Sequence, residues 1–215
     1  MALTLPVDLS DALYTVPSAD SSLELGALLP GYAAYARVFN PAREFDVAIT
    51  WASLARTSMR PDLQWYELQR IAPHANDMEP EMGTIDPGTA LALVGFLRPR
   101  TSTPDQCVFL VWEGYARLAA QAATAPVVSV PPYARQMHVL VGDVEDALEN
   151  LDEPPGERHP VWWLPADRAW SVCGDIYGRS VYVGATQDTI DALTRQPGLE
   201  AFRVPADYEV RGEDA

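Results

Sequence analysis

The fold is decided by residues 169–183, which read AWSVCGDIYGRSVYV. Apolar or small side chains alternate through residues 169–176, and a second β-friendly run follows at 180–183. Tyr177 and Gly178 stand between the two runs and give a tight-turn signal. We therefore predict an antiparallel β-hairpin at this point in the chain.

Strands and short helices alternate on both sides of this hairpin. Asp86 and Pro87 mark the clearest helix start, since Asp is a good N-cap and Pro suits the first helical position. The predicted strands are 32–39, 106–112, 127–132 (an edge or a linker), 136–141 and 201–204. The predicted helices are 44–58, 65–71, 87–98, 115–126, a short one after Asp143, and 186–195.

This order indicates an α+β fold in which helices pack on a mainly antiparallel sheet. The length of 215 residues favours a single domain over two. Within residues 1–215 we expect an irregular segment at 1–29 and a frayed tail at 206–215. Polar, proline-broken sequence predicts surface loops at 74–83 and 152–160.

The composition bounds the class of protein. Hydrophobic residues make up 48% of the chain, which is enough for a core. The net charge is −15, and all the basic residues are arginines. This excess of acid disfavours direct contact with nucleic-acid phosphates and with anionic membranes, and it suits either a basic protein partner or plain solubility. The first residues contain no basic start followed by an apolar run, so we expect a cytoplasmic protein.

No catalytic motif is present. The sequence lacks a phosphate-binding Gly-Lys loop, a dinucleotide-binding glycine pattern and a nucleophile elbow, and the absence of lysine excludes Schiff-base chemistry. No metal-ligand spacing occurs, and Cys107 and Cys173 lie in apolar runs that predict buried thiols. We therefore predict no catalytic residues, no cofactor and no metal, and we favour binding over catalysis.

Seven residues are candidates for a binding site. Trp162 and Trp163 are adjacent, and neighbouring side chains of a strand point to opposite sides, so either one is exposed for a ligand or both pack under loops. Arg168 is suited to an anionic group, or to an ion pair with one of the acids. The remaining candidates are Asp175, His138, Glu79 and Glu81. His138 is equally well explained as a core histidine, and Glu79 and Glu81 as members of a solvated loop.

Three pieces of sequence resemble a group of uncharacterised actinobacterial proteins. They are residues 101–115 (TSTPDQCVFLVWEGY), residues 162–170 (WWLPADRAW) followed by Asp175, and residues 182–184 (YVG). The resemblance covers roughly residues 30–205 and carries no assigned activity. A looser likeness, in size, acidity and element order, is to small α+β immunity-type proteins that neutralise toxins by binding them.

Three functional hypotheses follow. The first is a protein-binding module, like an immunity protein or inhibitor, whose acidic surface and exposed tryptophan hold a basic partner. The second is a small-molecule sensor or an enzyme with a pocket near Trp162, Arg168 and His138. The third, a DNA mimic, follows from acidity alone. The sequence does not indicate an oligomeric state.

Overall fold

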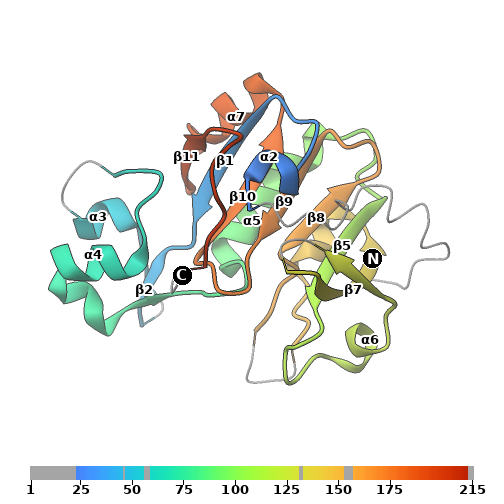
Figure 1. Cartoon of the computed structure of the whole chain (residues 1–215), viewed down its shortest axis with the longest axis horizontal. Coiled ribbons are helices and arrows are strands. Elements are labelled where there is room, and N and C mark those ends of the chain that lie inside the picture. Colours follow the sequence, from blue (N-terminus) through green and yellow to red (C-terminus); the bar gives the residue numbers. More distant parts are fainter. Residues whose placement is uncertain (1–22, 46, 56–58, 131–132, 153–156, 213–215) are drawn as a thin grey trace.

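The structure is a computed structural model that describes residues 23–45, 47–55, 59–130, 133–152 and 157–212. Its centre is an eight-stranded antiparallel sheet, which we call the main sheet, in the order β11-β1-β10-β9-β8-β5-β7-β6 (Figure 1). In that order the strands are β11 Glu200–Val204, β1 Ala34–Phe39, β10 Ser180–Ala185, β9 Trp170–Gly174, β8 Trp162–Pro165, β5 Cys107–Trp112, β7 Arg135–Gly142 and β6 Val127–Val130. The predicted α+β class with a mainly antiparallel sheet is confirmed.

The hairpin that decides the fold is present. Strands β9 and β10 pair antiparallel, with Val181 opposite Gly174, and the Gly178 amide donates to the Asp175 carbonyl at 2.9 Å to close the turn. The predicted strands at 106–112 and 136–141 are also found, as β5 and β7, and β6 lies at the edge of the sheet as expected. Local alternation and turn residues therefore predict these strands correctly.

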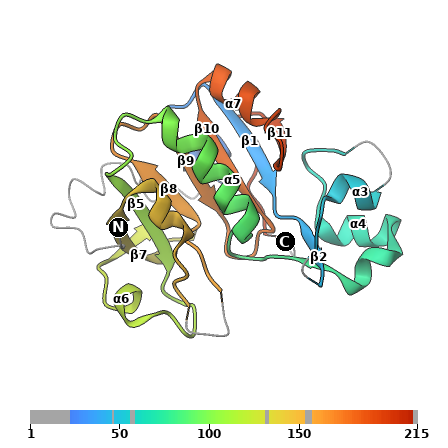
Figure 2. The ribbon, with the colours of Figure 1, turned by 180° about the vertical axis from the view of Figure 1, so that it is seen from behind.

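Helices cover the main sheet. Helix α5 (Pro87–Leu97) lies along one face (Figure 2), and the short helix α2 (Leu25–Leu28) lies across the opposite face (Figure 1). The Asp86 side chain caps α5 by accepting from the Thr89 amide at 3.0 Å, as the sequence predicts. Two further short helices pack on the sheet and close its core: η3 Val144–Leu148, capped by Asp143, and α7 Gln187–Leu193, capped by Thr186.

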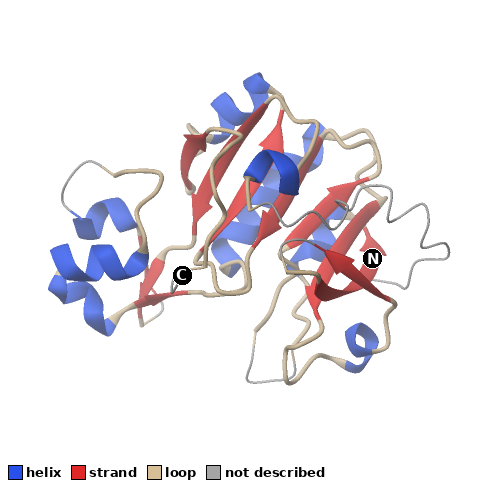
Figure 3. Cartoon of the chain, in the orientation of Figure 1, coloured by secondary structure: helices blue, strands red, loops and turns tan. Residues whose placement is uncertain are grey.

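Residues 42–80, which we call the small lobe, stand beside the main sheet (Figure 3). They form a second hydrophobic cluster built around Trp51, Trp65 and Leu68. Their elements are β2 Ala42–Glu44, β3 Val47–Ile49, α3 Trp51–Ala55, α4 Trp65–Ile71, η1 Pro73–Asp77 and β4 Glu79–Pro80. The helix predicted at 65–71 is confirmed as α4.

Two predictions in and near this lobe are wrong. The predicted helix at 44–58 begins instead as the β2–β3 hairpin, because Phe45 takes a left-handed backbone conformation (φ 55°) that reverses the chain. The predicted loop at 74–83 contains η1 and the strand β4, which pairs with β2. A third error lies elsewhere: the helix expected at 115–126 is reduced to α6 (Ala120–Ala123).

The side chain of Asn40 joins the lobe to the main sheet. Its amide nitrogen donates to the carbonyl oxygens of Glu81 and Thr84, both at 2.9 Å, and its oxygen accepts from the Asp86 amide at 3.0 Å. These bonds fasten the point where the chain leaves β1 to the point where it returns toward α5. Glu200 of β11 adds a second link by accepting from the backbone amides that open α3.

The two ends of the described chain are hydrogen-bonded to each other, and this corrects two expectations. The tail was expected to fray from 206, yet the Leu25 amide donates to the Tyr208 carbonyl at 2.8 Å and the Val210 amide to the Leu23 carbonyl at 2.9 Å. The segment 1–29 was expected to be irregular, yet it contains α2. Residues 1–22 and 213–215 lie outside the described residues.

Two further features bear on the predictions. Among the described residues, no helix has the length and apolar character needed to cross a bilayer. Both cysteines are buried, as expected, and burial raises the pKa of both thiols.

Candidate functional site

A cavity of about 780 Å³ opens where several chain turns meet at one end of the main sheet. We call it the groove. Its surface is mostly apolar, and it lies between the end of β5, the β6–β7 connection, the β9–β10 turn and the C-terminal segment. The lining residues are Leu23, Trp112, Tyr133, Arg135, Asp175, Ile176, Tyr177, Glu209, Val210, Arg211 and Gly212.

The β6–β7 connection presents Tyr133 to the groove through an unusual backbone. Tyr133 and Ala134 both have positive φ, 66° and 51°, although neither is glycine. Each such residue costs about 1–2 kcal/mol relative to an ordinary conformation, so the surrounding structure must hold it in place. The register that pairs Val130 with Arg135 fixes the start of β7 directly after this turn.

A largely buried ion pair forms the polar floor of the groove. Arg135 Nη2 lies 3.0 Å from Asp175 Oδ2, and Asp175 Oδ1 accepts from the Tyr177 amide at 2.8 Å. The Arg135 guanidinium is 5.4 Å from the ring centres of both Tyr133 and Tyr177. Cation–π attraction to two rings therefore supports the position of the arginine and of both tyrosines.

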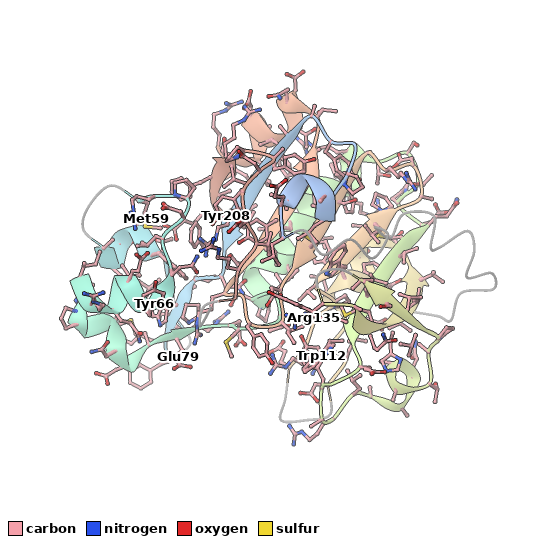
Figure 4. All side chains as sticks on the ribbon, in the orientation of Figure 1. Met59, Tyr66, Glu79, Trp112, Arg135 and Tyr208 are labelled. Carbon is pink, nitrogen blue, oxygen red and sulfur yellow. The ribbon has the colours of Figure 1, made fainter. Side chains whose placement is uncertain are left out.

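Three aromatic side chains surround the opening. Tyr133 and Tyr177 are 71% and 51% exposed, which is high for residues that line a cavity. Trp112 is the one tryptophan of the six that is only partly buried. Figure 4 shows Trp112 near Arg135 and away from Tyr66 of the small lobe. Flat apolar faces with few polar groups are typical of sites for small molecules.

Trp112 is itself positioned by a neighbour. Its ring meets that of Tyr115 edge to face, with centres 5.3 Å apart. Burial raises the pKa of Tyr115 to about 12, and its hydroxyl donates to the Gly83 carbonyl. Tyr115 therefore stays protonated at neutral pH and holds its ring against Trp112.

The charges at the groove balance. Arg135 pairs with Asp175, and Arg211 pairs with Glu209 at the rim. The charged side chains that line the groove in the described part of the chain therefore cancel, which favours a ligand without net charge.

The structure separates the residues predicted for a binding site. Of the seven, Asp175 alone lines the groove. Both tryptophans are buried in β8, so the alternative in which one of them is exposed is wrong and the alternative in which both are packed holds. Trp162 Nε1 donates to the Gly174 carbonyl at 3.3 Å, and Trp163 Nε1 to the Pro160 carbonyl at 2.7 Å.

The other predicted site residues lie apart from the groove. His138 is buried in β7, with Nδ1 3.0 Å from the Ala125 carbonyl. Arg168 is exposed in the turn between β8 and β9. Glu79 is exposed on β4, and Glu81 lines a separate polar pocket beside Arg158. Neither the groove nor the polar pocket beside Arg158 is lined by Trp162, Arg168 or His138.

Ten of the eleven lining residues were not predicted from the sequence, and four of them carry the argument for a site: Trp112, Tyr133, Arg135 and Tyr177. A signal existed for two of them, since Tyr177 stands in a predicted turn and Tyr133 follows two prolines at a predicted edge strand. Nothing local connects the four, because they come from three separate chain segments.

Within the described part of the chain, no group of three His, Cys, Asp or Glu side chains is placed to hold a metal ion. Comparisons with protein-family models, curated proteins and solved structures give no significant match.

Proposed function

We propose that this protein binds a small, flat and mostly apolar molecule, without net charge, in the groove. The observation that carries the proposal is the set of three aromatic side chains, Trp112, Tyr133 and Tyr177, around an apolar cavity of about 780 Å³. Cavities of roughly 300–1,000 Å³ with apolar walls and a few placed polar groups are characteristic of small-molecule sites.

The proposal is one of binding. The titratable groups with opposite charges that line the groove are engaged with one another, Arg135 with Asp175 and Glu209 with Arg211. Because each charged side chain is held in place by its partner, these groups suit the orientation of a ligand.

A fluorescent probe tests the proposal. N-phenyl-1-naphthylamine is aromatic, apolar and uncharged, and its emission rises when it leaves water. We expect saturable binding of one probe per chain. Removing one aromatic ring should lower the binding free energy by about 1 kcal/mol through lost stacking, and by a further amount through lost buried apolar area. Tyr133→Ala and Tyr177→Ala should therefore each weaken binding about tenfold.

Tyr66→Ala is the matched control, since Tyr66 is an exposed tyrosine of the small lobe that does not line the groove. Its affinity for the probe should equal that of the unaltered chain. Equal binding by all three variants, or no saturable binding at all, would contradict the proposal.

A second candidate function is the binding of a basic protein partner, as an immunity protein or inhibitor would do. The net charge of −15 favours it. A partner held by this charge should dissociate as salt rises from 0.05 to about 0.5 M, where the screening length falls to a few ångströms. The DNA-mimic hypothesis, the actinobacterial resemblance and the cytoplasmic location stay predictions.

A further inference from the structure

The guanidinium of Arg135 has more N–H groups than acceptors. It donates to Asp175 through Nη2 alone, at 3.0 Å. Its Nε is buried without an acceptor, and Nη1 has no hydrogen-bond partner among the described residues. Nη1 is not one of the enclosed atoms, so a molecule in the groove can reach it. Because arginine can only donate, an acceptor for these groups must come from water or from a ligand.

Trp112 adds a second donor of this kind. Its indole Nε1–H forms no hydrogen bond within the part of the chain that the structure describes, and the nitrogen is not enclosed. Buried tryptophans usually satisfy this group inside the protein. Four others do so by donating to main-chain carbonyls, namely Trp51 at 2.8 Å, Trp162 at 3.3 Å, Trp163 at 2.7 Å and Trp170 at 3.0 Å. The N–H of Trp112 is left for a molecule in the groove.

The two donors lie side by side on one face of the main sheet. Trp112 is directly opposite Met137 in the pairing of β5 with β7. Opposite side chains of an antiparallel pair share a face, and Arg135 is two residues from Met137, so Arg135 is a diagonal neighbour of Trp112. Such neighbours are about 7–8 Å apart, within reach of one another for long side chains. One ligand can therefore meet both donors.

The Trp112 ring is fixed before any ligand arrives. Tyr115 meets it edge to face. The backbone of Gly114 lies so close that a Cβ at this position would come within 2.3 Å of Trp112 Cζ2. A donor that is already held in place loses little conformational freedom on binding, so its hydrogen bond contributes more to affinity.

The carboxylates that line the groove are already engaged. Asp175 accepts from the Tyr177 amide at Oδ1 and from Arg135 at Oδ2, and Glu209 is paired at the rim. Tyrosine hydroxyls can donate or accept, so they favour neither kind of ligand. A ligand that only donates would leave the N–H groups of Arg135 and Trp112 unpaired, whereas a carbonyl oxygen has two lone pairs and can accept from both.

We propose that the ligand of the groove is a planar, conjugated carbonyl compound without net charge. Its ring system contacts Tyr133 and Tyr177, and its carbonyl oxygen accepts from Arg135 Nη1 and Trp112 Nε1. The charge on the guanidinium strengthens the first of these hydrogen bonds. The inference rests on the proposed function, because it names the chemical class of the molecule that the same groove binds.

Three tricyclic compounds of nearly equal size and shape test this class. At the same position 9-fluorenone carries a carbonyl acceptor, fluorene a methylene group and carbazole an N–H donor. Equilibrium dialysis against the full chain measures the dissociation constant of each. We expect fluorenone to bind about tenfold more tightly than fluorene, and carbazole no more tightly than fluorene. Burial of apolar surface alone would favour fluorene, which is the less polar of the first two.

Two variants test the donors. Arg135→Met with Asp175→Asn removes the guanidinium without leaving a buried carboxylate unpaired, and Trp112→Phe removes the indole N–H but keeps an aromatic ring. In each variant the preference for fluorenone over fluorene should fall by about threefold or more. The matched control is Arg60→Met with Asp62→Asn, an arginine–aspartate pair of the small lobe that does not line the groove, and it should leave the preference unchanged.

Each outcome decides. Equal binding of fluorenone and fluorene overturns the carbonyl class and keeps the proposed function. Carbazole binding more tightly than fluorenone also overturns it, because the groove would then present acceptors. A full preference for fluorenone in either variant overturns the assignment of the donors, and if the double variant binds neither compound, Trp112→Phe decides alone. Failure of all three compounds to bind the unaltered chain overturns both proposals.

Discussion

Replacing Asn40 by alanine should destabilise the protein by about 3–6 kcal/mol. The Asn40 side chain is fully buried and makes three hydrogen bonds, of 2.9, 2.9 and 3.0 Å, to backbone groups of Glu81, Thr84 and Asp86. Each buried backbone group that loses its partner costs about 1–3 kcal/mol, and a water molecule that enters the vacated space would recover part of this. Domains typically have 5–15 kcal/mol of stability in total, so the loss is large.

The substitution is specific because the backbone bonds of residue 40 survive it. The carbonyl of Asn40 still accepts from Trp51 Nε1 at 2.8 Å, and its amide still donates to the Arg179 carbonyl at 3.1 Å. Urea unfolding followed by tryptophan fluorescence measures the effect. Asn76→Ala, at an exposed position of η1, is the control and should change stability by less than about 0.5 kcal/mol. A loss below about 1 kcal/mol for Asn40→Ala would show that these bonds do not hold the lobe.

Two further predictions concern titratable groups. Burial raises the pKa of the thiols of Cys107 and Cys173. A disulfide-exchange reagent should therefore modify neither thiol in the folded protein and both thiols in urea. Fast reaction of either thiol without urea would refute this. Burial also raises the pKa of Glu200 above its ordinary 4.5. The folded state therefore holds this proton more tightly than the unfolded state, so Glu200 contributes stability at low pH that is lost as pH rises through the raised pKa. Subtracting the free energy of unfolding of Glu200→Gln from that of the unaltered chain isolates this contribution. The difference should fall as pH rises above 4.5 and level off near neutral pH. A difference that does not change with pH would contradict the reasoning.

Elements with strong local signals could be predicted from the sequence. The hairpin at 169–183, the capped helix α5 and the apolar strand β5 each depend on side-chain periodicity or on a cap within the element itself. The prediction of a helix at 44–58 was wrong because the apolar residues of this segment follow neither a clear helical period nor a clear strand period. Phe45 adopts a positive φ at the hairpin tip, and phenylalanine is not a residue type that signals this conformation in a sequence.

The candidate site was harder to predict than the fold. The pair of adjacent tryptophans left exposure open as one alternative, but both side chains are buried in β8. The groove is formed by side chains that meet only after the sheet has ordered β5, β7 and β9 as near neighbours. Of the predicted residues, Asp175 is there because the hairpin turn that was predicted correctly forms one wall.

The bonds from Asn40 to Glu81 and Thr84 also describe the path of the chain. They bring the start and the end of the small lobe into contact, so the lobe is an insertion whose two ends touch. The chain could therefore run from β1 to α5 across that contact without residues 42–80. A version of this fold in which a short turn replaces residues 42–80 is therefore geometrically permitted. It would expose the rings of Phe39 and Phe202, which the lobe now covers, and would remove the carbonyls of Pro61 and Leu63 to which the buried Arg37 guanidinium donates.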